Sequence, residues 1–179
     1  TLWSERFKSV LIEPKDHARQ VVGMYIDLNC VRAGIAEDPK DFRFCGYGEA
    51  IAGSSAAQDG IRTILGTCAG WNDAHAHYRE AMFGTGVEAK EAKRAVSEAA
   101  FDKVRNEGGR LPLPWVLRSR IRYFTDGAVL GSRAFVETHL ARYQKRYSMR
   151  QRCSPAPLVE VTDWRGLTTL RGLRTNPFR

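Results

Sequence analysis

Apolar residues recur at spacings of three and four between Asp16 and Gly34, and this pattern predicts a helix that buries one face. Asp16 suits the N-cap of such a helix, and Gly34 suits the position just after its end. Pro14 closes the preceding segment, residues 2–13, in which polar and bulky residues alternate loosely as in a strand. The apolar positions of the helix are Val21, Val22, Tyr25, Leu28 and Val31.

Glycines divide the middle of the chain into shorter segments with helical patterns. Three stretches favour helices, at residues 56–66, 72–83 and 88–106. A loop with two glycines and two prolines follows at residues 107–114. This loop is the best internal boundary, because glycine and proline interrupt regular structure and the charge of the chain changes sign here.

Two further helices are predicted beyond that loop, at residues 114–124 and 132–147. The intervening sequence, Thr125-Asp-Gly-Ala-Val-Leu-Gly131, is interpreted as their connection. The arrangement faintly resembles a helix-turn-helix, which binds DNA. An amphipathic helical hairpin with a solvated basic face explains the pattern equally well.

The composition is that of an ordinary globular protein, with 43% hydrophobic and 27% charged residues among 179. No run of eighteen apolar residues is present, so no membrane span is expected. The four cysteines lack the close spacing of zinc ligands, which favours reduced thiols in a cytoplasmic protein. A start at Thr1, inside a predicted strand, favours a fragment of a longer protein.

The net charge of +8 is unevenly distributed along the chain. Residues 110–179 contain fourteen Lys or Arg and only four Asp or Glu, whereas residues 1–109 contain fourteen and sixteen. A basic region binds polyanions because contacts with phosphates release counterions. Charge alone leaves open whether this region binds nucleic acid or is simply a solvated surface.

Tyr25 and Asn29 are four residues apart on the predicted helix and therefore point the same way. A phenol oxygen can attack a phosphodiester and hold the strand covalently, and a metal can polarise the phosphate during that attack. The amide oxygen of Asn29 suits Mg²⁺ or Mn²⁺. Taken without other information, the pair is better explained as a core tyrosine and a capping asparagine.

The segment from Tyr25 to Gly34, YIDLNCVRAG, resembles the motif YIHLNPVRAGLV of REP-associated tyrosine transposases, which are IS200-like single-tyrosine enzymes. Residues 36–47, AEDPKDFRFCGY, resemble that family's VEDPxDYxWSSY. Residues 2–13, LWSERFKSVLIE, resemble its LWxxRYKSxLVE. Weaker similarity to long members of the family extends to residues 122–137 and 164–174.

The resemblance implies that Tyr25 is the nucleophile and that Asn29 is a metal ligand. It implies an α+β fold: residues 1–50 would be the C-terminal part of a ferredoxin-like transposase domain. A helical linker at 51–108 and a mostly helical, basic extension at 109–179 would follow. The sequence departs from the motif at Asp27 (usually His), at Cys30 (usually Pro) and at Phe44-Cys-Gly (usually Trp-Ser-Ser). Cys30 predicts an unbroken helix here, since proline would interrupt it.

The family's second signature is a His-hydrophobic-His pair upstream of the tyrosine, and this chain does not contain it. His75 and His77 come after the tyrosine and lie in a predicted helix, where side chains two residues apart diverge by about 200°. We therefore expect an incomplete site for Mg²⁺ or Mn²⁺ in this chain, and no DNA cleavage by the chain alone.

The implied reaction is cleavage and rejoining of single-stranded DNA through a 5′-phosphotyrosine link at hairpin or palindromic elements. A non-catalytic DNA-binding protein, derived from a domesticated or decayed transposase, is the alternative. A purely structural helical module would fit the middle of the chain but not its basic end. The residues predicted to contact DNA are Arg6, Lys8, Arg32, Arg118, Arg120, Arg122 and Arg133.

Overall fold

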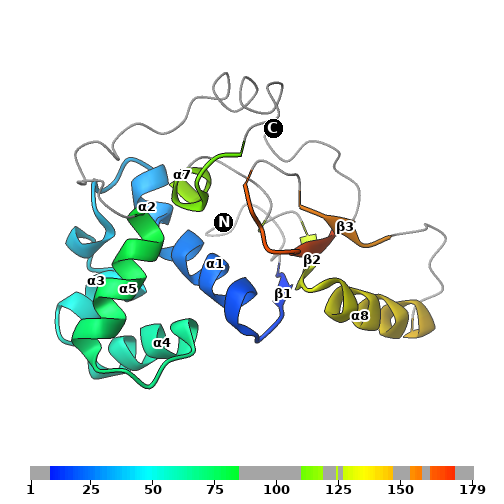
Figure 1. Cartoon of the computed structure of the whole chain (residues 1–179), viewed down its shortest axis with the longest axis horizontal. Helices are drawn as coiled ribbons and strands as arrows, with labels where there is room; N and C mark the ends of the chain where they lie inside the picture. The colour runs from blue at the N-terminus through cyan, green and yellow to red at the C-terminus, as the bar shows by residue number, and fades with distance from the viewer. Residues whose placement is uncertain are drawn as a thin grey trace, which may run out of the picture. The chain divides into compact units, whose positions relative to one another are not determined.

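The computed structural model combines helices with a small sheet, so the fold is mixed α+β, as predicted at the level of class (Figure 1). The described residues are 9–84, 110–118, 124, 127–146, 154–158 and 162–171. The chain forms two compact units. The sheet unit takes residues 1–18, 121–158 and 165–179, and the helical unit takes 19–120 and 159–164. The units therefore interleave along the chain, whereas the three predicted parts follow one another.

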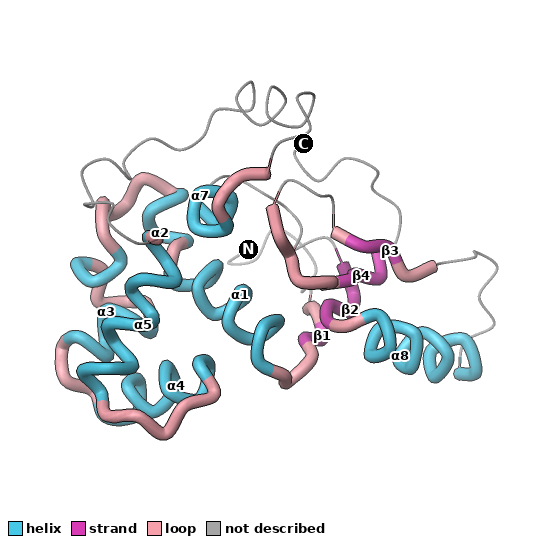
Figure 2. Tube along the Cα trace, viewed as in Figure 1, coloured by secondary structure: helices cyan, strands magenta, loops and turns pink. Residues whose placement is uncertain are grey.

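The sheet unit is built from strands that are distant in sequence (Figure 2). Their spatial order is β1-β2-β4-β3. β1 pairs with β2 in parallel, and β4 pairs with both β2 and β3 in antiparallel fashion. The strands are β1 (Leu11–Ile12), β2 (Gly127–Gly131), β3 (Ala156–Pro157) and β4 (Thr168–Arg171).

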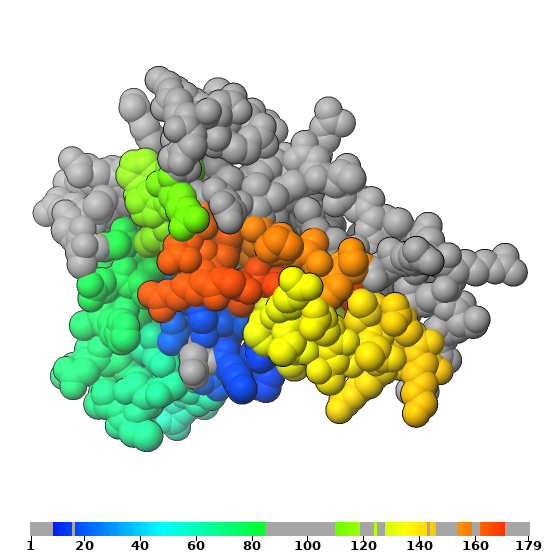
Figure 3. All heavy atoms as spheres, turned by 45° about the vertical axis from the view of Figure 1, so that its right-hand side comes forward, coloured from blue at the N-terminus to red at the C-terminus, as the bar shows by residue number. Residues whose placement is uncertain are grey.

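Helix α8 (Arg133–Arg146) packs on this sheet and confirms the helix predicted at 132–147. Val136 and Leu140 form a buried cluster with Val129 and Leu170. The outward side chains of α8 stand at the surface of the unit (Figure 3). The helix therefore has one apolar face against the sheet and one face open to solvent.

The connection predicted at residues 125–131 was wrong, because residues 127–131 form strand β2. Val129 and Leu130 are buried, and both pair with β1 on one side and β4 on the other. Branched and long apolar side chains suit such a doubly paired strand. The helix-turn-helix interpretation of this region is therefore also wrong.

Glu13 joins the end of β1 to the beginning of α8. Its carboxylate accepts hydrogen bonds from the backbone N–H of Ser132 at 2.6 Å and from its hydroxyl at 3.0 Å. A carboxylate near a helix N-terminus is favourable, because backbone N–H groups there are otherwise unpaired. Gly131 permits this approach, since a Cβ there would lie 2.6 Å from Cβ of Glu13.

The helical unit contains most of α1 and a series of shorter helices. Predicted helices 56–66 and 72–83 are confirmed, and predicted helix 88–106 lies outside the described residues. No helix in the described part is long and apolar enough to cross a membrane. The elements are α1 (Asp16–Asp27), α2 (Asn29–Arg32), the 3₁₀ helix η1 (Pro39–Asp41), α3 (Gly46–Ile51), α4 (Ser55–Leu65), α5 (Trp71–Phe83) and α7 (Leu113–Arg118).

The helix predicted between Asp16 and Gly34 is present, but it is interrupted at Leu28, where α1 ends and α2 follows. The expectation that Cys30 gives an unbroken helix was therefore wrong. Gly34 has a φ of +70°, as suits the predicted stop. Gly23 of α1 lies against α4, because a Cβ there would be 3.0 Å from Cδ1 of Ile64.

Candidate functional site

The interruption at Leu28 lies between the two residues predicted to carry the chemistry. Tyr25 is in the last turns of α1 and is partly buried, and Asn29 is the first residue of α2 and is exposed. Leu28, the residue between the end of α1 and the beginning of α2, is fully buried and anchors this joint between the two helices in the core. Its N–H still donates to Met24 O at 2.9 Å, and its carbonyl accepts from the N–H of Arg32 at 3.0 Å.

Arg32 contacts both sides of this joint. Its guanidinium lies 3.7 Å from the centroid of the Tyr25 ring, and Nη2 donates to the Tyr25 carbonyl at 2.7 Å. Nη2 also reaches Oδ1 of Asn29 at 3.4 Å, and Nη1 donates to the carbonyl of Leu117 at 2.7 Å. Burial lowers the pKa of Arg32, and the contacts with Tyr25 oppose that shift. The guanidinium stays charged at any physiological pH.

Asp27 holds the joint from another side. It is buried, and its carboxylate accepts hydrogen bonds from the N–H of Tyr47 at 3.1 Å and from the hydroxyl of Tyr78 at 2.8 Å. Burial raises the pKa of Asp27, although the bonds from Tyr78 and Tyr47 act in the opposite direction. Asp27 therefore ties the end of α1 to the beginning of α3 and to α5.

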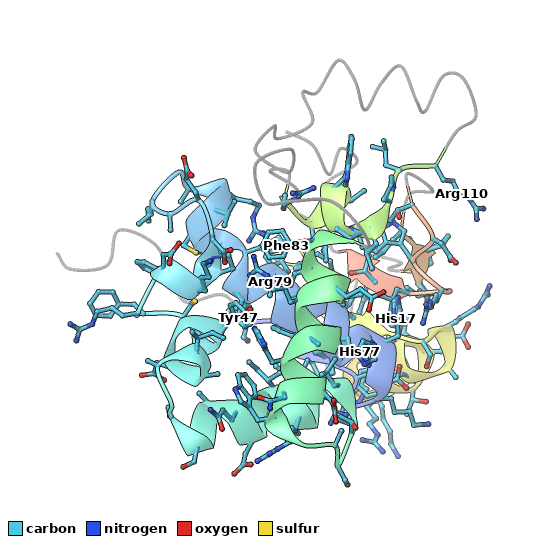
Figure 4. The ribbon with its side chains drawn as sticks, turned by 60° about the vertical axis from the view of Figure 1, so that its left-hand side comes forward. His17, Tyr47, His77, Arg79, Phe83 and Arg110 are labelled. Carbon is cyan, nitrogen blue, oxygen red and sulfur yellow. The ribbon has the colours of Figure 1, made fainter. Side chains whose placement is uncertain are left out.

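A second polar network connects η1, α3 and α5. Arg79 donates to Asp38 through Nη2 at 2.6 Å and through Nη1 at 3.2 Å, and Nη1 reaches the Tyr47 hydroxyl at 3.4 Å. That hydroxyl lies 2.8 Å from Nε2 of His75. Figure 4 shows Arg79 beside Tyr47 and Phe83. The centroid of the Phe83 ring lies 4.7 Å from the guanidinium. These contacts make the network part of the core of the helical unit.

The two histidines of the predicted helix have separate surroundings. His75 bonds to Tyr47 and packs with tilted rings against Trp71, at 5.5 Å between centroids. Its pKa is lowered by burial and by Arg79. His77 is exposed (Figure 4). Within the described residues, no three His, Cys, Asp or Glu side chains gather in a way that could hold a metal.

The arginines predicted to contact DNA have different environments. Arg118 is only 6% exposed, and its Nε donates to Pro114 O at 3.2 Å. Burial lowers its pKa. This burial leaves little of the guanidinium accessible to a phosphate, and the predicted phosphate contact stays a prediction. Arg133 is exposed at the start of α8 and pairs with Glu137 at 2.8 Å. Arg6, Lys8, Arg120 and Arg122 lie outside the described residues.

Sequence reasoning placed Tyr25 and Asn29 but missed what surrounds them. It assigned Arg32 to phosphate, whereas the guanidinium is engaged with Tyr25, Asn29 and Leu117. It treated Asp27 only as a departure from a motif. The sequence did contain a signal for the contacts of Asp27, which is a carboxylate in Tyr-Ile-Asp-Leu on a helix with a buried face. A buried charge needs partners, so a carboxylate at such a position indicates hydrogen bonds inside the protein.

Comparisons of the chain with family models, with curated proteins and with solved structures found no match.

Proposed function

We propose that this chain is the tyrosine-bearing part of a DNA transposase that cleaves and rejoins single-stranded DNA at hairpin or palindromic elements. The observation that carries the proposal is the joint between α1 and α2. There, Tyr25 and the exposed Asn29 of the resembled motif are both contacted by one cation, Arg32. The catalytic domain would be ferredoxin-like, with α1 as its tyrosine helix.

In the proposed reaction, the Tyr25 oxygen attacks the phosphorus of a DNA phosphodiester. A new bond joins this oxygen to phosphorus, and the bond from phosphorus to the 3′ oxygen breaks. The phenol proton is released, and the departing 3′ oxygen takes up a proton. The 5′-phosphate remains on Tyr25 until a 3′-hydroxyl attacks it and restores a phosphodiester.

The described residues fit the metal implied by the resemblance only in part. Asn29 offers an exposed amide oxygen, which is a suitable ligand for Mg²⁺ or Mn²⁺. That oxygen lies 3.4 Å from Nη2 of Arg32, and no three His, Cys, Asp or Glu side chains of the described part gather in a way that could hold a metal. Two histidines upstream of the tyrosine supply the other ligands in the resembled family. We therefore assign no step of the reaction to a metal held by this chain alone.

The test is Tyr25→Phe in the full-length gene product, with labelled hairpin DNA and divalent metal, and with adducts separated on a denaturing gel. The substitution removes the attacking oxygen and keeps the ring beside Arg32, so the change in stability should be at most on the order of 1 kcal/mol. Adduct and cleavage should vanish while hairpin binding persists. Asn29→Ala should slow cleavage but leave some adduct. Adduct formation by Tyr25→Phe at the normal rate would refute the proposal.

A non-catalytic DNA-binding protein is the second candidate. It is favoured by the exposed cations on α8, Arg133, Arg142 and Lys145, together with the contact of Asn29 with Arg32. Under this alternative the wild-type full-length protein binds hairpins with a steep salt dependence and forms no adduct. The same gel therefore separates the two candidates.

A further inference from the structure

The break at Leu28 creates a geometric problem for the candidate site. In an uninterrupted helix, residues four apart face the same way because the regular hydrogen-bond ladder fixes both of them. Here the ladder is interrupted between Tyr25 and Asn29. Ladder bonds reach Leu28 from both sides, and contacts outside the ladder add to them in fixing the placement of Tyr25 relative to Asn29.

Arg32 supplies such contacts. Its guanidinium carbon lies over the Tyr25 ring, 3.7 Å from the centroid, and the same group bonds to the Tyr25 carbonyl and approaches the Asn29 amide oxygen. Its third anchor is the Leu117 carbonyl of α7, at 2.7 Å. A planar group with several fixed donors can satisfy these partners together, whereas a lysine ammonium is a point charge without that shape.

We propose that Arg32 is a positioning residue, which fixes the Tyr25 ring relative to the Asn29 amide and anchors both to α7. This inference rests on the proposed role of Tyr25. It replaces the prediction that Arg32 binds a DNA phosphate, because its guanidinium already has backbone and aromatic partners inside the helical unit.

Helix α7 becomes part of the site as a consequence. Residues 113–118 were predicted to belong to a separate basic extension, yet α2 and α7 lie side by side in the helical unit (Figure 1). The short bond from Arg32 to Leu117 is the link between them. Movement of α7 would therefore move the guanidinium that holds Tyr25.

The first test compares Arg32→Lys with Arg43→Lys in the full-length gene product. Arg43 is a matched control, because it is exposed and its guanidinium also lies over an aromatic ring, that of Phe44 at 4.8 Å. At saturating hairpin DNA, Arg32→Lys should slow single-turnover adduct formation by about tenfold to a hundredfold, as expected when a reacting group is misplaced. Hairpin affinity and its salt dependence should stay close to wild type. Arg43→Lys should change neither quantity.

A second test needs no catalysis and uses the chain itself. Tetranitromethane modifies accessible tyrosine rings, and mass spectrometry of peptides assigns the modified residue. The guanidinium over Tyr25 should protect its ring, so Arg32→Lys should speed nitration of Tyr25 several-fold. The buried Tyr47 serves as internal reference, and its modification should not change. Circular dichroism of both variants verifies that the helices are intact.

Three results would overturn the inference: unchanged nitration of Tyr25, an unchanged adduct rate in Arg32→Lys, or a loss confined to DNA affinity with a reduced salt slope. The last result would make Arg32 a phosphate contact. An adduct that survives Tyr25→Phe would instead refute the proposed function, and the nitration experiment would still decide whether Arg32 holds Tyr25. The two failures are therefore distinguishable.

Discussion

The ion pair between Arg79 and Asp38 should stabilise the helical unit far more than an ordinary surface pair. Two hydrogen bonds join the residues, at 2.6 and 3.2 Å, and the side chains are 31% and 7% exposed. Arg79→Met keeps the apolar stem beside Phe83 but removes the nearer cation from the buried Asp38 carboxylate, while Nζ of Lys40, 3.9 Å from that carboxylate, remains. Each hydrogen bond to a charged group contributes about 1.5–3 kcal/mol, and two such bonds are lost here. The partial exposure of Arg79 reduces their summed contribution. We expect a loss of about 3 kcal/mol for Arg79→Met.

The assay is a double-mutant cycle in urea, followed by far-ultraviolet circular dichroism. Asp38→Asn retains an acceptor for the N–H of Lys40 but loses the charge, so its expected cost is about 2 kcal/mol. The double variant should lose less than the sum of the two, with a coupling energy of about 1.5 kcal/mol. The matched control is Arg62→Met, which breaks the pair with the exposed Asp59 and should cost about 0.5 kcal/mol.

Acidification gives an independent check on the same pair. Burial alone would raise the pKa of Asp38, but hydrogen bonds from Arg79 and from the N–H of Lys40 outweigh it, and the pKa lies below its usual value. A lowered folded-state pKa means that the stabilisation is present above the unfolded value, near 3.9, and is lost as pH falls through the folded one. The advantage of wild type over Asp38→Asn should therefore shrink below about pH 4. Additive losses in the cycle, or an advantage that is flat with pH, would refute the reasoning.

Two other substitutions test the packing around the candidate site. Gly48→Ala should lower the free energy of unfolding by about 3 kcal/mol, because a Cβ there would lie 2.2 Å from the Phe42 carbonyl oxygen. Gly60→Ala, where a Cβ would meet open space, should raise it by up to about 1 kcal/mol. Equal urea midpoints for the two variants would contradict this reasoning. Asp27→Asn tests the carboxyl whose pKa burial raises. The contribution of such a group is present below the unfolded pKa and is lost as pH rises through the folded one. The variant should therefore gain on wild type as pH rises above about 4, and parallel stability profiles would count against this.

Local periodicity was sufficient to predict the helices but not the sheet. Helices α4, α5 and α8 follow from apolar residues at helical spacing, since the contacts that define a helix are local. Strand β2 was missed because its short apolar core, Val129 and Leu130, is flanked by glycines that suggest a turn. Its partners, β1 and β4, come from distant parts of the chain, and sequence spacing gives no access to such pairing.

The candidate site shows the same limit at the level of side chains. A motif and a spacing of four pointed to Tyr25 and Asn29, because both residues lie on one short segment. The partners that hold this segment are the Tyr78 hydroxyl for Asp27 and the Leu117 carbonyl for Arg32. Both partners belong to helices far along the chain. Charge in the sequence therefore singled out Arg32, but it could not predict the contacts of its guanidinium with Tyr25 and Leu117.

The helix breaks at Leu28 although position 30 is a cysteine and not the proline of the motif that the segment resembles. Position 30 lies in the first turn of α2, where the N–H that proline lacks is not needed by the helix. Cys30 occupies this place without restoring a continuous helix, and its thiol donates to the carbonyl of Asp27 at 3.3 Å. The break therefore does not depend on proline. The chain is anchored on both sides of this break, by Asp27 to α3 and α5 and by Arg32 to α7.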